Sequence, residues 1–243
     1  MRKLILDVLF PIECLGCGQE NVWLCEECLN KLEITKGYFI PNDYKPSDID
    51  GFCIATDWEN ELLQEVIHKF KYNFAQELAE PLGGLLIKKL AGVLEVYPEL
   101  RVFEIVPVPL HRKRLAWRGF NQAELLAQEV ANKFDMQLNK SVLKRIKNTS
   151  PQVKLKSEMR AQNIAGAFGV LVGCGKNFPL LTKEGVRGSL IKDLPHPSLL
   201  LIKERRYLLI DDVITTGATM NECARILKEN GAEKVYGLAL ARG

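Results

Sequence analysis

The sequence contains no apolar run that approaches the ~18 residues a membrane-spanning helix requires. Its apolar N-terminal stretch is short, is interrupted by Asp7 and lacks the small-residue cleavage site of a signal peptide. Internal repeats and low-complexity tracts are also absent. We therefore expect a cytoplasmic globular protein with no membrane span, long enough for one α/β domain and a small appendage.

Histidine is scarce, and two common nucleotide-binding loops are missing. The three histidines, His68, His111 and His196, are not spaced as metal ligands. The nearest stretch to a P-loop, GVLVGCGKN (169–177), lacks the spacing of G-x-x-x-x-G-K-[ST]. It also lacks the third glycine of a dinucleotide fingerprint. The sequence therefore argues against both kinds of nucleotide site.

The small net charge of +3 conceals one strongly basic segment. Residues 1–110 carry 10 Lys/Arg and 18 Asp/Glu, whereas residues 111–160 carry 12 Lys/Arg and 4 Asp/Glu. Such a concentration of one sign suggests an anionic partner. A solvated basic helix face is the alternative reading of the same segment.

Four of the seven cysteines form the pattern C-x2-C-x7-C-x2-C, namely Cys14, Cys17, Cys25 and Cys28. Each pair lets two thiolates converge on one tetrahedral metal, and we interpret the set as a structural zinc knuckle. Four thiolates leave no open coordination position, so the expected role is folding. A disulfide pair is the alternative, although nothing marks the chain as secreted. We expect Cys53 and Cys223 to be buried free thiols.

The order of predicted elements favours a parallel sheet flanked by helices. The second half contains an apolar strand, a turn, a helix and another strand, which is a βαβ unit. Expected strands cover 51–58, 102–109, 165–172, 206–213 and 234–241, and expected helices cover much of 60–95, 121–134 and 220–232. Between them we expect a basic loop at 110–120 and a mobile arm at 148–163. Asn121 is the expected capping side chain of the helix that follows the basic loop.

Two adjacent acids, Asp211 and Asp212, end an apolar strand and precede a turn that is rich in hydroxyl groups. In a parallel sheet, ligands bind beyond the carboxyl ends of the strands. The turn leads into a helix N-terminus, where free N–H groups and threonine hydroxyls favour phosphate. Carboxylates would repel a phosphate that they touched, so they suit sugar hydroxyls better. The pattern predicts a sugar 5-phosphate site, with a plain surface turn as the alternative.

The stretch LLIDDVITTGAT (208–219) resembles the phosphoribosyl-pyrophosphate (PRPP) signature of type I phosphoribosyltransferases. Residues 106–131, the later positions Gln152, Arg160, Asn163, Ala167 and Phe168, and the cysteine knuckle resemble the ComF/GntX family. The resemblance implies a type I phosphoribosyltransferase-like parallel sheet flanked by helices (51–243), behind a small four-cysteine zinc knuckle and linker (1–50). An insertion at about 173–203 departs from the family pattern.

The resemblance also implies roles for individual residues. Asp211 and Asp212 would be the catalytic acids that hold the ribose hydroxyls. The PRPP site would further include Val213, Thr215, Thr216, Gly217, Ala218 and Thr219. Candidate pyrophosphate contacts are Arg112, Arg114, Arg118, Lys154 and Arg160. Mg²⁺ would accompany PRPP, bridging oxygens of its pyrophosphate and ribose.

Two functions follow from these expectations. The first is a PRPP-binding protein of single-stranded DNA uptake in natural transformation, with other DNA-uptake proteins as partners. Its candidate nucleic-acid contacts are Lys69, Lys71, Arg112, Lys113, Arg114, Trp117, Arg118 and Phe120, which combine charge with rings for base stacking. The second is an active phosphoribosyltransferase that moves ribose 5-phosphate from PRPP to a base or amine.

Overall fold

A computed structural model describes residues 12–37, 39, 47–73, 75–149, 163–171, 180–182, 185–186 and 205–243. Residues 150–162 of the expected mobile arm, which include Lys154 and Arg160, lie outside the described residues, as do Cys174 and His196. Within the described part, no helix is long and apolar enough to cross a membrane.

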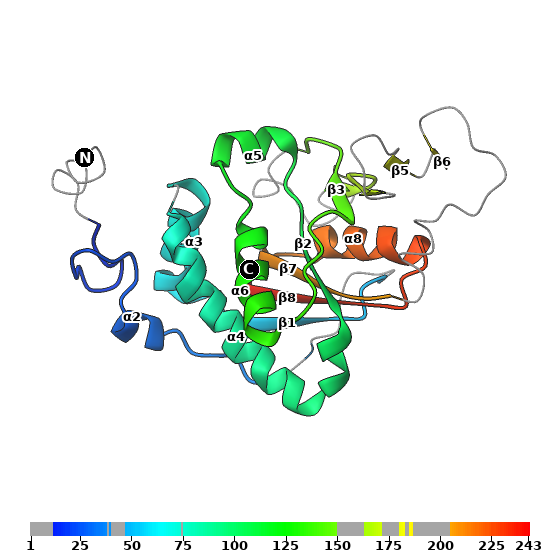
Figure 1. Cartoon of the computed structure of the whole chain (residues 1–243). Coiled ribbons are helices and arrows are strands. Elements are labelled where there is room, and N and C mark those ends of the chain that lie inside the picture. The colour runs from blue at the N-terminus through cyan, green and yellow to red at the C-terminus, as the bar shows by residue number, and fades with distance from the viewer. Residues whose placement is uncertain are drawn as a thin grey trace.

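The centre of the molecule is a four-stranded parallel sheet (Figure 1). The strands lie in the order β1 (Gly51–Asp57), β8 (Lys234–Arg242), β7 (Arg206–Ile214) and β2 (Glu104–Pro107). Every pairing is parallel, and Asp211 of β7 lies opposite Ala239 of β8. The predicted parallel α/β architecture is therefore confirmed.

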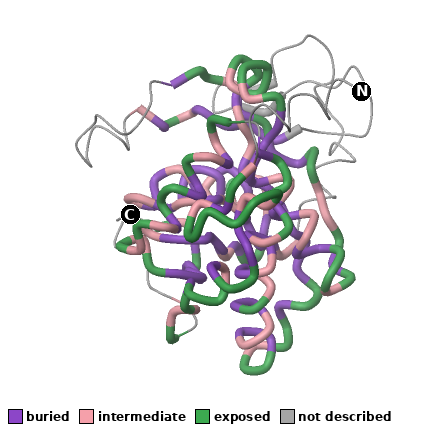
Figure 2. Tube along the Cα trace, turned by 90° about the vertical axis from the view of Figure 1, so that its left-hand side faces the viewer, coloured by how far each residue is buried: buried purple, intermediate pink, exposed green. Residues whose placement is uncertain are grey.

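Helices cover both faces of this sheet because alternate strand residues point to opposite faces. Leu208 and Ile210 pack in one core with α3 (Glu61–Tyr72), α4 (Ala79–Val96) and α6 (Gln122–Phe134). Tyr207 and Leu209 pack in a second core with α8 (Ala218–Glu229). Figure 2 shows the buried residues gathered in the middle of the molecule, between exposed outer turns. Two short 3-10 helices, Gln76–Leu78 and Pro98–Val102, join the larger elements.

A second, antiparallel sheet lies beside α8. It comprises β3 (Leu143–Arg145), β4 (Phe168–Leu171), β5 (Leu180–Thr182) and β6 (Gly185–Val186), in that order. Phe168 and Val170 of β4 contribute to the same core as α8. Strands β5 and β6 fall within the stretch at 173–203 that departs from the family pattern, so part of that insertion extends this sheet.

The expected basic loop at 110–120 is wrong, because residues Arg112–Arg118 form the short helix α5. The Nδ1 atom of His111 accepts a hydrogen bond from the backbone N–H of Lys113, which caps the first turn. Gly119 ends the helix with a φ of 77°, a left-handed conformation that glycine adopts without strain. A cap and a terminating glycine were thus both present in the sequence.

The expected capping role of the Asn121 side chain is also wrong. Asn121 occupies the N-cap position of α6, but its side chain accepts no hydrogen bond from the first turn. Its Nδ2 atom instead donates to the carbonyl of Val108 at 3.1 Å. This bond fastens the segment after β2 to the start of α6.

The N-terminal cysteine segment packs on the same core as α3 and α4. Cys14, Cys25 and Cys28 are buried in that core, and helix α2 (Glu26–Asn30) begins directly after Cys25. Lys89 of α4 fixes the following segment, because its Nζ atom donates to the carbonyls of Thr35 and Gly37 at 2.7 and 2.6 Å. The division into two regions at residue 50 stays a prediction.

Replacing Lys89 by methionine should lower the free energy of unfolding by about 1–3 kcal/mol, because the hydrogen bonds from its charged ammonium group to the carbonyls of Thr35 and Gly37 are lost. Lys89 is only 5% exposed, so it makes these contacts inside the fold. Urea unfolding measures the change. Lys88→Met is the matched control, since Lys88 is exposed. Equal stability of the two variants would show that the Lys89 contacts contribute nothing.

Candidate functional site

The two acids lie at the carboxyl end of β7, where a parallel sheet offers ligand sites. One carboxylate oxygen of Asp211 accepts the backbone N–H of Asp212 at 2.9 Å, and one of Asp212 accepts that of Val213 at 2.6 Å. These bonds fix the direction of both side chains. Among the described residues, no partner contacts the second oxygen of either carboxylate, so each can accept a ligand hydroxyl.

Lys71, in the last turn of α3, forms an ion pair with Asp212 at 2.8 Å. The side chains of Lys71 and Asp212 are only 20% and 10% exposed, so solvent screens the pair weakly. Sequence reasoning placed Lys71 on a nucleic-acid surface and missed this contact. The pair is long-range, and the short basic stretch around Lys71 gives no sign of its partner.

Burial raises the pKa of Asp211, and the neighbouring charge of Asp212 raises it further. Lys71 and Arg145 oppose this rise in pKa because their positive charges favour the carboxylate. Asp211 therefore takes up a proton at a higher pH than an ordinary aspartate. Arg145 is a second residue near the acids that sequence reasoning missed, since it was one of many cations in the basic segment.

The turn after the acids lines a cavity of about 200 Å³. Gly217 has a φ of 79° and directly precedes α8, so the backbone turns sharply at the helix N-terminus. Thr215, Gly217, Ala218 and Thr219 line this phosphate-turn cavity together with Asp211 and Val213. The structure thus brings most of the predicted PRPP residues to one concave place. Thr216 lies in the same turn, where its hydroxyl accepts the N–H of Ala218 at 3.4 Å.

Trp58 and Lys71 complete the wall of the phosphate-turn cavity. Trp58 follows the last residue of β1, so it lies at the same carboxyl edge of the sheet as the acids. The sequence contained a signal for Trp58, because it is the last residue of the strand predicted at 51–58. Its place at this edge could therefore have been predicted.

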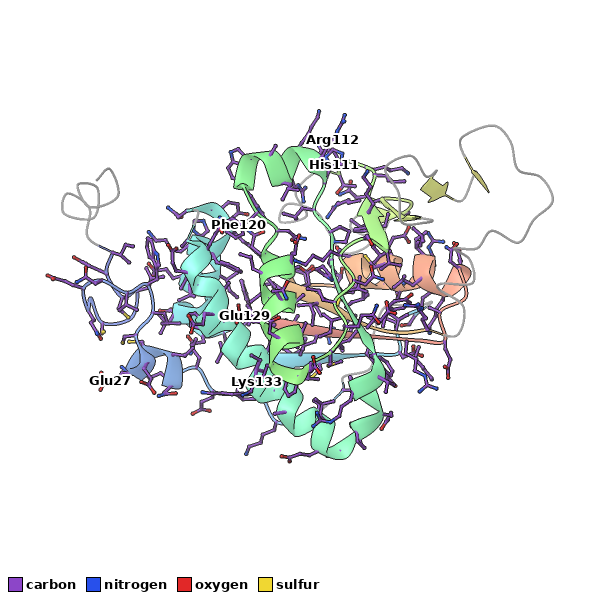
Figure 3. The ribbon with its side chains drawn as sticks, viewed as in Figure 1. Glu27, His111, Arg112, Phe120, Glu129 and Lys133 are labelled. Atoms are coloured by element: carbon purple, nitrogen blue, oxygen red, sulfur yellow. The ribbon has the colours of Figure 1, made fainter. Side chains whose placement is uncertain are left out.

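The three described arginines predicted to contact pyrophosphate do not line the phosphate-turn cavity. Arg114 donates to the carbonyl of Thr149 at 2.7 Å, and Arg118 donates to Gln122 at 3.0 Å. Arg112 is exposed at the start of α5, next to His111 (Figure 3). Their role with pyrophosphate stays a prediction.

The nucleic-acid candidates fall into an exposed group and a buried one. Trp117 is 63% exposed, and its ring centre lies 5.9 Å from that of Tyr72. The guanidinium group of Arg118 lies over the Tyr72 ring, 5.1 Å from its centre. Phe120 is buried against Phe70, so the expectation that Phe120 stacks on bases is wrong.

The three lysines among the nucleic-acid candidates lie in different environments. Lys113 is exposed on α5, whereas the Lys69 ammonium lies 6.0 Å from the centre of the Trp23 ring. Lys71 faces Asp212, as described above. Lys113 is therefore the lysine of this set that is fully available on the surface of α5.

The four clustered cysteines could hold a metal ion. Their Sγ atoms all lie within 4.8 Å of one another, and those of Cys17 and Cys25 are 3.6 Å apart. A tetrahedral zinc with bonds of about 2.3 Å places its sulfurs about 3.8 Å apart, whereas a disulfide needs about 2.05 Å. A Cβ on Gly16 would lie 2.6 Å from the sulfur of Cys28, so the site requires glycine there. All six cysteines of the described segments are free thiols.

Comparison with known proteins agrees with this geometry. The phosphoribosyl transferase domain family matches residues 121–242. Competence protein F of Haemophilus influenzae is 32% identical over 234 residues, covering 96% of this chain and 85% of that protein. DNA utilization protein YhgH of Escherichia coli is 28% identical over 180 residues, covering 74% of this chain and 67% of that protein. Competence protein ComFC of Bacillus subtilis is 25% identical over 239 residues, covering 90% of this chain and 84% of that protein.

The matches to competence protein F and ComFC cover 96% and 90% of this chain, and the residues matched by the phosphoribosyl transferase domain family, 121–242, include Asp211, Asp212 and the turn before α8. The resemblance seen in the sequence is confirmed: the chain belongs to the ComF family, whose members named above are competence and DNA-utilization proteins, and it carries a phosphoribosyltransferase fold.

Proposed function

We propose that the protein binds PRPP and takes part in the uptake of single-stranded DNA. One observation carries the PRPP part: Asp211 of β7 and the turn before α8 line a single cavity of about 200 Å³, and Asp212 directly follows Asp211 in the strand. The turn supplies backbone N–H groups at a helix N-terminus, which suit the 5-phosphate. The acids Asp211 and Asp212 supply acceptors for the two ribose hydroxyls, a few ångströms away from the phosphate.

Metal ions complete the proposed site and the proposed fold. Mg²⁺, bound with PRPP, would neutralise the pyrophosphate, and it usually keeps several waters and needs few protein ligands. Asp211 and Asp212 are the described carboxylates placed to approach it. Zn²⁺ is the metal that four clustered thiolates select, and it would hold the N-terminal segment in shape.

The DNA part rests on the relatives, which are named as competence and DNA-utilization proteins, and on the surface around α5. Arg112 and Lys113 on α5 are exposed cations, and Trp117 and Tyr72 are exposed rings, which together suit a strand that offers phosphates and unpaired bases. Arg118 over the Tyr72 ring holds one of these rings in place. The strand would lie along α5 and the end of α3.

Thermal unfolding with and without PRPP tests the ligand. At 100 times its dissociation constant, PRPP with Mg²⁺ should stabilise the protein by about 2.7 kcal/mol, which raises Tm by roughly 5–10 °C in a domain of this size. Ribose 5-phosphate and pyrophosphate alone should each give a smaller shift, since each fills part of the site. An unchanged Tm at millimolar PRPP would refute the proposed ligand.

Replacing Trp117 by alanine should weaken binding of single-stranded DNA by about 1–3 kcal/mol, the usual contribution of one base stacked on a ring. Fluorescence anisotropy of a labelled oligonucleotide measures this change. Val102→Ala is the control, because Val102 is a 71% exposed apolar residue outside the surface around α5. Affinity that is insensitive to both Trp117 and salt would contradict the proposed DNA surface.

A second candidate function is phosphoribosyl transfer itself, which the intact acids and turn favour. Departure of pyrophosphate leaves positive charge on the ribose, which Asp211 and Asp212 would stabilise. Release of pyrophosphate from PRPP in the presence of bases, amines or nucleosides measures this activity. If no acceptor gives turnover while PRPP still binds, the transferase function fails and the binding function stands.

A further inference from the structure

A second and larger cavity, of about 550 Å³, lies between the start of α5 and strand β3. We call it the α5–β3 cavity. It shares no lining residue with the phosphate-turn cavity. Figure 3 shows His111 and Arg112 at the end of α5 that faces β3. Its volume lies in the range of small-molecule sites, about 300–1,000 Å³.

The positive charge of the side chains that line the α5–β3 cavity favours an anionic ligand. Arg112, Lys144 and Arg145 line it, and none has a carboxylate ion-pair partner among the described residues. The one acid in the lining, Glu124, is paired with Lys140 at 3.2 Å. Three cations in a concave site therefore have no described carboxylate in direct contact.

Arg145 is the strongest sign of a ligand. It is only 7% exposed, and burying a cation without an ionic partner is costly. Its Nη2 atom donates to the hydroxyl of Thr149 at 2.6 Å, and its guanidinium lies 5.2 Å from the Phe168 ring centre. Its Nε–H is buried and has no hydrogen-bond partner within the described segments. An anionic oxygen in the cavity would supply that partner.

The rest of the lining is apolar and suits a flat, weakly polar body. Pro107, Pro109, Leu110, Leu143 and Ile146 line the α5–β3 cavity. Asn121, which directs its amide N–H toward Val108, adds a side-chain oxygen that can accept from an N–H group of a base. Phosphate alone would leave the apolar wall unused, and a nucleoside alone would leave the cations unpaired.

His111 adds a hydrogen-bond donor to the same wall. Burial and the charges of Arg112 and Lys113 lower the pKa of His111, which favours the neutral ring at pH 7. Its Nδ1 atom already accepts the N–H of Lys113, so the ring proton lies on Nε2. The cavity can thus donate as well as accept.

We propose that the α5–β3 cavity binds a nucleoside monophosphate group, either as a free nucleotide or as the phosphorylated end of a DNA strand. The phosphate lies against the cations, and the base lies on the apolar wall. This binding does not require PRPP to occupy the other cavity.

Calorimetric titration of the full chain with dTMP tests the inference. Saturating PRPP and Mg²⁺ keep the phosphate-turn cavity filled; if PRPP does not bind, Thr215→Glu blocks that cavity instead. We expect one dTMP per chain, with thymidine and inorganic phosphate each binding at least tenfold more weakly. Absence of dTMP binding, or its displacement by PRPP, would overturn the inference.

Lys144→Glu should weaken dTMP binding about tenfold and leave the fold intact, since Lys144 is exposed. Lys133→Glu is the matched control. Lys133 is exposed at the C-terminal end of α6, whereas the α5–β3 cavity lies at the N-terminal end of this helix, and Lys133 lines neither cavity (Figure 3). Equal affinity in the two variants would contradict the proposed position. PRPP titration of the same variants reports separately on the proposed function.

Oligonucleotides distinguish the two sources of the nucleotide. A strand with a terminal phosphate should bind more tightly than the same strand with a hydroxyl end if the cavity holds a strand end, and Lys144→Glu should remove the difference. Equal binding of the two strands, with dTMP binding still sensitive to Lys144→Glu, identifies the ligand as a free nucleotide.

Discussion

Replacing Cys28 by alanine should reduce the zinc content from about one ion per chain to none and destabilise the N-terminal segment by several kcal/mol. Cys28 is 1% exposed, and its Sγ atom lies within 4.8 Å of those of the other three clustered cysteines. Structural zinc contributes about 10–16 kcal/mol to the folding of zinc-finger peptides. Elemental analysis of the purified protein measures the zinc content, and urea unfolding measures the change in stability.

Cys53→Ala is the control for this result. Cys53 is as buried as Cys28, at 1% exposure, but lies on β1 outside the cluster. Loss of its thiol should leave the metal content unchanged and cost much less stability. A Cys28→Ala protein that keeps its metal, or a wild-type protein that binds none, would refute a four-thiolate zinc site.

The double substitution Asp211→Asn and Asp212→Asn should weaken PRPP binding at least 100-fold. Each hydrogen bond to a charged group contributes about 1.5–3 kcal/mol, and a tenfold change in affinity corresponds to about 1.4 kcal/mol. Asparagine keeps the size of aspartate, so the phosphate-turn cavity keeps its shape. Calorimetry of both proteins measures the difference.

The same double variant should lose little stability. Loss of the Lys71–Asp212 ion pair is offset by relief of the repulsion between the two carboxylates, which raises the pKa of Asp211. Asp57→Asn is the matched control, because Asp57 ends β1, which lies two strands from β7 in the same sheet, and does not line the phosphate-turn cavity. PRPP affinity that is unchanged in the double variant would remove the acids from the site.

The local parts of this molecule could be read from the sequence. Continuous apolar runs predicted the strands of the parallel sheet, because these strands are buried on both faces. The acids followed by a glycine turn predicted the phosphate-turn cavity. The cysteine spacing predicted the cluster of four thiols for the same reason: the four cysteines lie within 15 residues of one another. In each case a few neighbouring residues contain the whole feature.

The parts that depended on distant contacts could not be read in this way. Lys71 and Asp212 are brought together by the packing of α3 near the end of β7, which no local pattern encodes. Arg145 reaches the neighbourhood of Asp211 only because β3 belongs to a second sheet beside α8. Helix α5 is a different case, because the sequence did contain its capping residue, His111, and its terminating residue, Gly119. The high density of basic residues in this stretch led to the prediction of a loop instead.

Isothermal titration of the wild-type protein with PRPP and Mg²⁺ tests the central claim most directly. The account predicts one PRPP per chain, with heat that disappears in the Asp211→Asn and Asp212→Asn double variant and persists in Asp57→Asn. No heat from the wild-type protein, or equal heat from the double variant, would contradict the claim that the acids and the turn before α8 form a phosphoribosyl site.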